Sequence, residues 1–156
     1  MHPIYRPDQD QVLLNVSIPR FLLTFLAGYI VASQLNWGIA EFFLNDWARP
    51  RLDGFMREGS MAASGANISK LTFGFMLPLF VIAFLQAAII RPVSWAARAI
   101  LLAVLISIAA FYGTYTFISG WGNVNWAPLM VVATADMICM IVGALIIGFL
   151  QQWRAP

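Results

Sequence analysis

The chain has 156 residues, of which 61% are hydrophobic and 10% are charged, and its formal net charge is +2. A soluble domain is about half apolar and about a quarter charged, so this composition excludes a soluble globular enzyme and a disordered chain. It indicates a small integral membrane protein.

The numbers of cysteine and histidine and the distribution of basic residues limit the ligands that the chain can bind. Cys139 is the only cysteine and His2 the only histidine, which excludes an intrachain disulfide and a haem or metal site built from several histidines. Lys and Arg form no basic run. We therefore expect no cofactor, no metal and no nucleic-acid partner.

Four apolar runs are long enough to cross a bilayer, because about 20 helical residues cover about 30 Å of hydrocarbon. Within a single transmembrane domain, 1–156, we predict four spans and one long loop, 42–69. The predicted spans cover residues 20–41, 70–90, 97–118 and 128–152. The first apolar run is longer than the apolar core of a signal peptide, which has about 7–15 residues. We therefore expect this run to stay in the protein as a membrane span and not to be cleaved off. The fold class predicted is an all-α, up-down-up-down four-helix membrane bundle.

The first span carries two patterns. Gln34, Trp37 and Glu41 share a helical face and give the span a polar and aromatic stripe. Gly28 and Ala32 lie four residues apart and form a small-residue seam, which allows close helix approach. This seam lies partly off the polar stripe, so we expect it to face away from the bundle, towards another subunit.

The long first loop contains the pattern of a short helix at the membrane interface. Pro50 suits a helix start, and three apolar residues then recur at helical spacing: Leu52, Phe55 and Met56. Trp47 precedes them and suits an interfacial anchor.

The second span opens at Lys70. It contains Pro78, which is expected to bend the helix, and Gln86, a buried amide that needs a hydrogen-bond partner inside the bilayer.

The third span has a second small-residue seam, Ala109 and Gly113, which favours close packing. An ideal helical period places four small or polar residues together on the face beside it: Ala103, Ser107, Ala110 and Thr114.

Asp136 in the fourth span is the one residue that is charged at neutral pH and lies away from the ends of the predicted spans. A charge at the bilayer centre costs at least ~2.5–3.5 kcal/mol, so Asp136 should face protein or water. The helical period places it on the same side as a third seam, Gly143, Ala144 and Gly148. We therefore predict that its carboxylate faces the bundle, either as a structural contact or as a group that handles protons, cations or a polar head group.

The candidate polar or ligand site combines Asp136 with residues expected at the same mouth of the bundle. Lys70 is the expected counter-ion of Asp136, because its long side chain can reach the interface. If Lys70 does not reach it, we expect a polar group of the first span instead. Glu41, Gln34 and Trp37 complete the candidate site. No catalytic residue is assigned, because no Ser–His–acid set, phosphate loop or zinc helix is present.

The stretch 135–153 begins with Ala135 and Asp136, continues with small residues and closes with Trp153. The layout resembles the last span of small bacterial four-span inner-membrane proteins of unknown function. The pair Trp37-Gly38, followed by a long amphipathic loop, is similar too. The resemblance implies a bacterial inner-membrane setting and no particular activity.

Positive residues near the span ends predict the orientation. Five lie on the side of both termini: Arg6, Arg20, Arg91, Arg98 and Arg154. Four lie on the other side: Arg49, Arg51, Arg57 and Lys70. The difference between the two sides is small, and the short loop flanked by Arg91 and Arg98 decides it in favour of the side that carries the termini. We therefore expect both termini in the cytoplasm.

The sequence leaves three functions open. The leading one is a non-enzymatic accessory or scaffold subunit that acts by helix–helix association in a larger or homo-oligomeric membrane complex. Its partners would be membrane lipid and other membrane subunits or a second copy. The alternatives are a small transporter or channel that uses Asp136, and a lipid-processing membrane enzyme.

Overall fold

The structure, a computed structural model, describes residues 16–52, 65–88, 94–122 and 124–152. These residues form helices and no strand. The main helices are α1 (Ile18–Ile39), α4 (Gly65–Ala88), α5 (Trp95–Ser107), α6 (Thr114–Trp121) and α7 (Trp126–Gln152). Short elements extend α1 and join α5 to α6: η2 (Ala40–Leu44), α2 (Asn45–Ala48), η3 (Arg49–Arg51) and η4 (Ile108–Gly113).

Four helical stretches are long and apolar enough to cross a membrane: Ile18–Leu44, Ser69–Ala88, Trp95–Trp121 and Trp126–Gln152. The predicted all-α four-helix membrane bundle is confirmed, and the chain is a multi-pass membrane protein. The first and third stretches extend further than the sequence predicted, because η2 prolongs the first and α6 prolongs the third.

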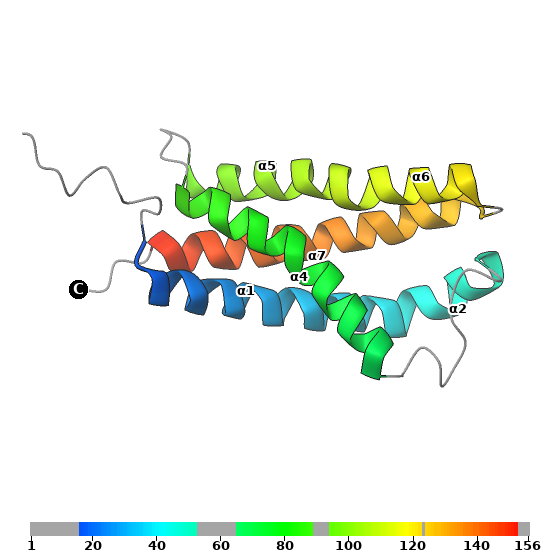
Figure 1. Cartoon of the computed structure of the whole chain (residues 1–156), viewed down its shortest axis with the longest axis horizontal. Coiled ribbons are helices and arrows are strands. Elements are labelled where there is room, and N and C mark those ends of the chain that lie inside the picture. The colour runs from blue at the N-terminus through cyan, green and yellow to red at the C-terminus, as the bar shows by residue number, and fades with distance from the viewer. Residues whose placement is uncertain (1–15, 53–64, 89–93, 123, 153–156) are drawn as a thin grey trace, which may run out of the picture.

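The four spans alternate in direction (Figure 1). The Arg20 guanidinium donates a hydrogen bond to the Leu150 carbonyl oxygen at 2.9 Å, which places the start of α1 beside the end of α7. We call this the terminal end of the bundle. The opposite end, which carries α2, η3 and the turn between α6 and α7, is called the turn end.

Local sequence signals account for where the helices begin. Pro19 stands in the first turn of α1, where its missing N–H costs nothing. The Ser94 side chain accepts a hydrogen bond from Ala97 N at 3.3 Å and caps α5. The Asn125 carboxamide oxygen accepts one from Ala127 N at 3.2 Å at the start of α7.

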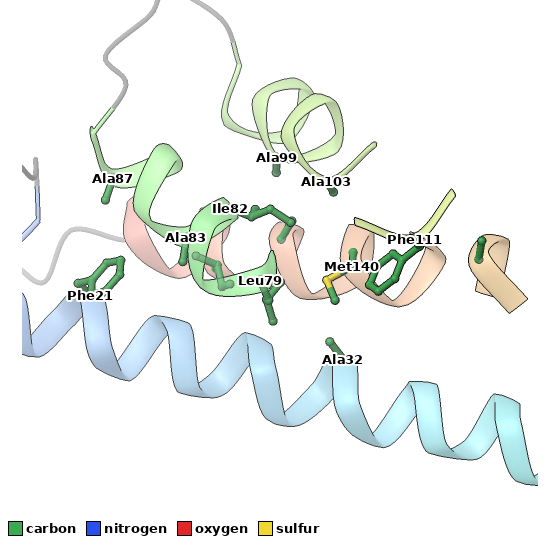
Figure 2. Packing of buried hydrophobic residues seen from close by; sticks show 13 residues of the cluster. Phe21, Ala32, Leu79, Ile82, Ala83, Ala87, Ala99, Ala103, Phe111 and Met140 are labelled. Carbon is green, nitrogen blue, oxygen red and sulfur yellow. The ribbon is translucent and has the colours of Figure 1, made fainter. Parts of the chain in front are cut away.

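Helix α7 is the centre of the bundle, since it packs against α1, α4, α5 and α6. Its buried side chains meet those of the other spans in one apolar core (Figure 2). Leu79, Ile82, Met140 and Ile147 are fully buried there. Large apolar side chains on the outer surface of the spans are exposed, as lipid-facing residues are.

The outward orientation expected for Gly28 and Ala32 is wrong. A Cβ atom added at Gly28 would lie 2.8 Å from the Gly143 carbonyl oxygen and would also meet the Ile147 side chain. Ala32 is 0% exposed. Small residues on both helices let α1 approach α7 closely, so this pairing lies inside the bundle.

Most of the short helix predicted after Pro50 lies outside the described residues, so the prediction stays open. Pro50 lies inside η3 rather than at the start of a new helix, and α2 precedes it. The Arg51 guanidinium lies 4.7 Å from the centre of the Trp47 ring. Phe55 and Met56, the other two apolar positions of the pattern, lie outside the described residues.

Candidate functional site

Asp136 joins three spans. It is 8% exposed and lies on α7 where α7 faces both α1 and α6. The Asn36 side-chain amide donates to Asp136 Oδ1 at 2.6 Å, and the Tyr115 hydroxyl donates to Asp136 Oδ2 at 3.0 Å. Each carboxylate oxygen therefore accepts one hydrogen bond from a neutral donor. We call these three residues the Asp136 cluster.

The face of α1 that packs on α7 positions Asn36. Thr24, Gly28 and Ala32 are buried at successive four-residue steps, and Asn36 is the next step. The same close approach that requires Gly28 therefore brings the Asn36 amide to the carboxylate.

A π-helical segment, η4, positions Tyr115. Ala99, Ala103, Ser107 and Phe111 are buried at four-residue steps along the third span, and Tyr115 follows four residues later. In an uninterrupted α-helix each such step overshoots one turn by about 40°, so four steps would turn Tyr115 about 160° away from Ala99. A π-helical turn holds more residues than an α-turn and absorbs the excess, so the inward face continues past Phe111.

The same segment overturns the face predicted for the third span. Ala103 and Ser107 are buried as expected, but Ala110 is only half-buried and Thr114 is exposed. Ala109 and Gly113 are exposed on the outside of the bundle. The prediction fails beyond Ser107 because it assumed 3.6 residues per turn throughout.

The prediction that Lys70 is the counter-ion of Asp136 is also wrong. Lys70 is exposed near the start of α4, and among the described residues no lysine or arginine forms an ion pair with Asp136. Residues 69–74 are all exposed because α4 crosses the bundle obliquely and its first turns project from it (Figure 1). The polar group of the first span, expected as the second possibility, is Asn36.

The remaining predicted members of the site do not reach the carboxylate. Gln34, Trp37 and Glu41 are exposed, whereas Asn36 on the same span turns towards α7. Asn36 and Tyr115 are the two residues that the sequence reading missed. The four-residue repeat from Thr24 could have indicated Asn36. A similar repeat leads to Tyr115, but it indicates an inward face only if a π-helical turn maintains it.

The other predicted seam lies on α7, towards the terminal end. Gly143, Ala144 and Gly148 are all buried. The Gln86 amide donates to the Ala144 carbonyl oxygen at 3.1 Å, which supplies the partner that the sequence required. A Cβ atom at Gly148 would lie 2.6 Å from Gln86 Oε1, so the absence of a side chain there makes room for the amide.

An apolar cluster lies between the Asp136 cluster and the turn end. Ala48, Leu52 and Leu129 are buried against one another, and the Tyr115 side chain packs against them. We call Ala48, Leu52 and Leu129 the cap cluster. Tyr115 thus touches the cap cluster with its ring and Asp136 with its hydroxyl.

The described residues contain no group of three or more His, Cys, Asp or Glu side chains that could hold a metal ion. No family model, curated protein or solved structure matches the chain. The resemblance to small bacterial four-span proteins therefore stays a prediction. The fold and the site define a multi-pass membrane protein with a buried carboxylate, Asp136, held by two neutral hydrogen-bond donors.

Tyr115→Phe should lower the free energy of unfolding by about 1–3 kcal/mol, because it removes a donor and leaves a buried carboxylate oxygen unpaired. Thermal unfolding in mild detergent measures the loss. The matched control is Tyr112→Phe, since the Tyr112 hydroxyl bonds Thr134 Oγ1 at an exposed position. Equal stability of the two variants would show that the Tyr115 bond contributes nothing to the fold.

Proposed function

We propose that the protein binds and releases a proton at Asp136 inside the membrane, as a small transporter or channel. The observation that carries the proposal is a buried carboxylate with two neutral hydrogen-bond donors and no cationic partner among the described residues. No cation in the described part of the chain compensates its negative charge, and a bound proton neutralises it.

A purely structural role accounts poorly for this carboxylate. A charged group inside a bilayer costs at least ~2.5–3.5 kcal/mol. Replacement of buried ionic groups by apolar side chains of similar volume is often neutral or stabilising. A bundle that needed only packing here would therefore be served as well by apolar side chains at positions 36, 115 and 136 together.

The hydrogen-bond chemistry favours a proton over a metal cation. Asn36 and Tyr115 both point donor hydrogens at the carboxylate, whereas a cation requires several oxygen ligands. The Tyr115 hydroxyl can also act as an acceptor. When Asp136 takes up a proton at Oδ2, the new O–H can donate to the Tyr115 oxygen, so the cluster keeps a hydrogen bond in both protonation states.

The setting proposed for this activity is a bacterial inner membrane with both termini in the cytoplasm. The positive residues near the span ends support that orientation. The turn end of the bundle would then face the outside of the cell.

Asp136→Asn should abolish proton flux through the reconstituted protein, because asparagine can still hydrogen-bond but does not titrate. A pH-sensitive dye inside liposomes, with a potassium gradient and valinomycin supplying the driving force, measures the flux. Thr134→Val is the matched control, since Thr134 lies two residues away on an exposed part of α7. Proton flux that survives Asp136→Asn would overturn the proposal.

Association as an accessory or scaffold subunit is the second candidate. The observation that favours it is the exposed position of Ala109 and Gly113, which form a small-residue surface on the outside of the third span. Other membrane subunits or a second copy are its possible partners. Lipid processing gains no such support, because Glu41 is exposed and Asp136 is buried, so the two carboxylates do not form a pair.

Gly113→Leu should weaken such an association without unfolding the bundle. A Cβ atom at Gly113 has one neighbour, the Ile108 carbonyl oxygen at an ordinary 3.4 Å, so a larger side chain fits. Mass measurement in native-like lipid compares the variant with the wild type and with Gly74→Leu, an exposed glycine on another span. A wild-type chain that is monomeric and carries no other protein would remove this candidate.

A further inference from the structure

The geometry points to the turn end as the side from which Asp136 exchanges its proton, with the cap cluster as the gate on that route. The inference rests on the proposed function, since it assigns a direction and a gate to the same site. It depends on three features of the described residues: the packing on the terminal side of Asp136, the position of the cap cluster and the segment that carries it.

The terminal side of Asp136 is tightly packed. A Cβ atom at Gly143 would lie 2.9 Å from the Ala32 Cβ and 3.1 Å from Leu79 Cδ1. Met140 and Ile147 on the same stretch of α7 are 0% exposed. Ala32, Leu79 and Met140 belong to the one apolar core that α1, α4 and α7 share (Figure 2). A proton leaving in this direction would have to pass about 24 Å of helix, from Asp136 to the end of α7.

The turn end is closer to Asp136 than the terminal end is. Asp136 lies ten residues after Trp126, the first residue of α7, which is about 15 Å of helix. Leu129 stands between them, is 1% exposed and packs in one cluster with Ala48 and Leu52. Tyr115 connects this cluster directly to the carboxylate, so a movement of the cap cluster would expose the tyrosine that holds Asp136.

The segment 45–52 that carries Ala48 and Leu52 is short and held locally. Besides the bonds within its helical turns, its described hydrogen bonds join its own residues: Leu52 N to the Ala48 oxygen at 2.9 Å, and the Arg51 guanidinium to the Trp47 oxygen at 2.6 Å. Its contact with α7 is apolar, through Ala48 and Leu52 with Trp47 packed beside them. The π-helical turn η2 joins the segment to α1, and such turns often mark functional sites. The segment can therefore lift without breaking these hydrogen bonds.

A cysteine reporter tests the route. Asp136→Cys is made in a Cys139→Ala background and reconstituted in vesicles of one orientation, established by protease access to a tag at the terminal end. A charged, membrane-impermeant thiol reagent is then added to one side at a time. We expect labelling from the turn end and none from the terminal end. Labelling from the terminal end alone, or equally from both ends, would overturn the inference.

Leu52→Ala tests the gate in the same vesicles. Truncation of a buried leucine removes apolar contact that holds the segment closed, so labelling should become faster by about tenfold or more. Leu79→Ala is the matched control, because Leu79 is as well buried but lies on the terminal side of Asp136. Equal acceleration by the two variants, or none by Leu52→Ala, would show that the cap cluster is not the gate.

A second measurement uses the native carboxylate. Infrared spectroscopy follows deuterium exchange of the Asp136 carboxyl in wild type, Leu52→Ala and the exposed-site control Leu26→Ala. Faster exchange in Leu52→Ala alone supports the gate, and equal rates in all three refute it. If the gate is supported but Asp136→Asn still conducts protons, the access route stands and the proposed transport function fails, so the two failures are distinguishable.

Discussion

Gly28→Leu should prevent assembly of the native bundle. The added side chain would begin 2.8 Å from the Gly143 carbonyl oxygen, a backbone atom of the helix at the centre of the fold. A side chain can move aside, but a backbone carbonyl moves only with its helix, so α1 would have to separate from α7. Overpacking of a core costs about 1–3 kcal/mol and sometimes more. Here it would also pull Asn36 away from Asp136.

Size-exclusion profiles and thermal unfolding in mild detergent measure this effect. Gly38→Leu is the matched control, because Gly38 lies on the same helix and a Cβ atom there would meet nothing within 4 Å. We expect Gly38→Leu to behave as the wild type. A Gly28→Leu protein as stable as Gly38→Leu would show that α1 and α7 do not pack as described.

The class of fold follows from the sequence because the hydropathy of a run is read directly along the chain. Each span needs about 20 apolar residues in a row, and each run of that length became a helix. The inward orientation of Asp136 follows for a related reason, since a charge facing lipid is too costly to leave there. Neither prediction requires knowledge of which helices are neighbours.

The partners of Asp136 depend on three-dimensional packing. The depth of Lys70 in the membrane follows from its position in the chain, but the direction in which α4 crosses the bundle does not. The structure places Lys70 on the exposed first turns of that helix. The seam of Gly28 and Ala32 was identified correctly as a surface for close approach, but its partner is α7 rather than another subunit.

The third span shows the limit of helical periodicity. A period of 3.6 residues groups Ser107 with Ala110 and Thr114, whereas the structure turns Phe111 and Tyr115 inward instead. The four-residue spacing of Ala103, Ser107 and Phe111 is visible in the sequence. It becomes informative only when one knows that a π-helical segment can maintain it.

Because the inward position of Tyr115 depends on η4, deletion of one residue from η4 should have a large effect. Removal of Ala110 should shorten the π-helical segment to an α-helical one and rotate α6 by about 100° relative to α5. Ala99 and Ala103 hold α5 on α7, while the Tyr115–Asp136 bond and the Trp126–Thr116 bond at 3.1 Å hold α6. Both halves cannot keep their contacts after the rotation.

The deletion should therefore unpair Asp136 and uncover the Tyr115 ring, with a loss of at least about 3 kcal/mol in the free energy of unfolding and loss of proton flux. Thermal unfolding and the liposome assay measure the two effects. Ala109→Leu is the control, because it enlarges an exposed residue of the same segment and keeps its length. The decisive comparison adds Tyr115→Phe to the deletion. If that second change still destabilises the shortened chain as much as it does the wild type, Tyr115 has kept its bond, and η4 does not set the register of the cluster.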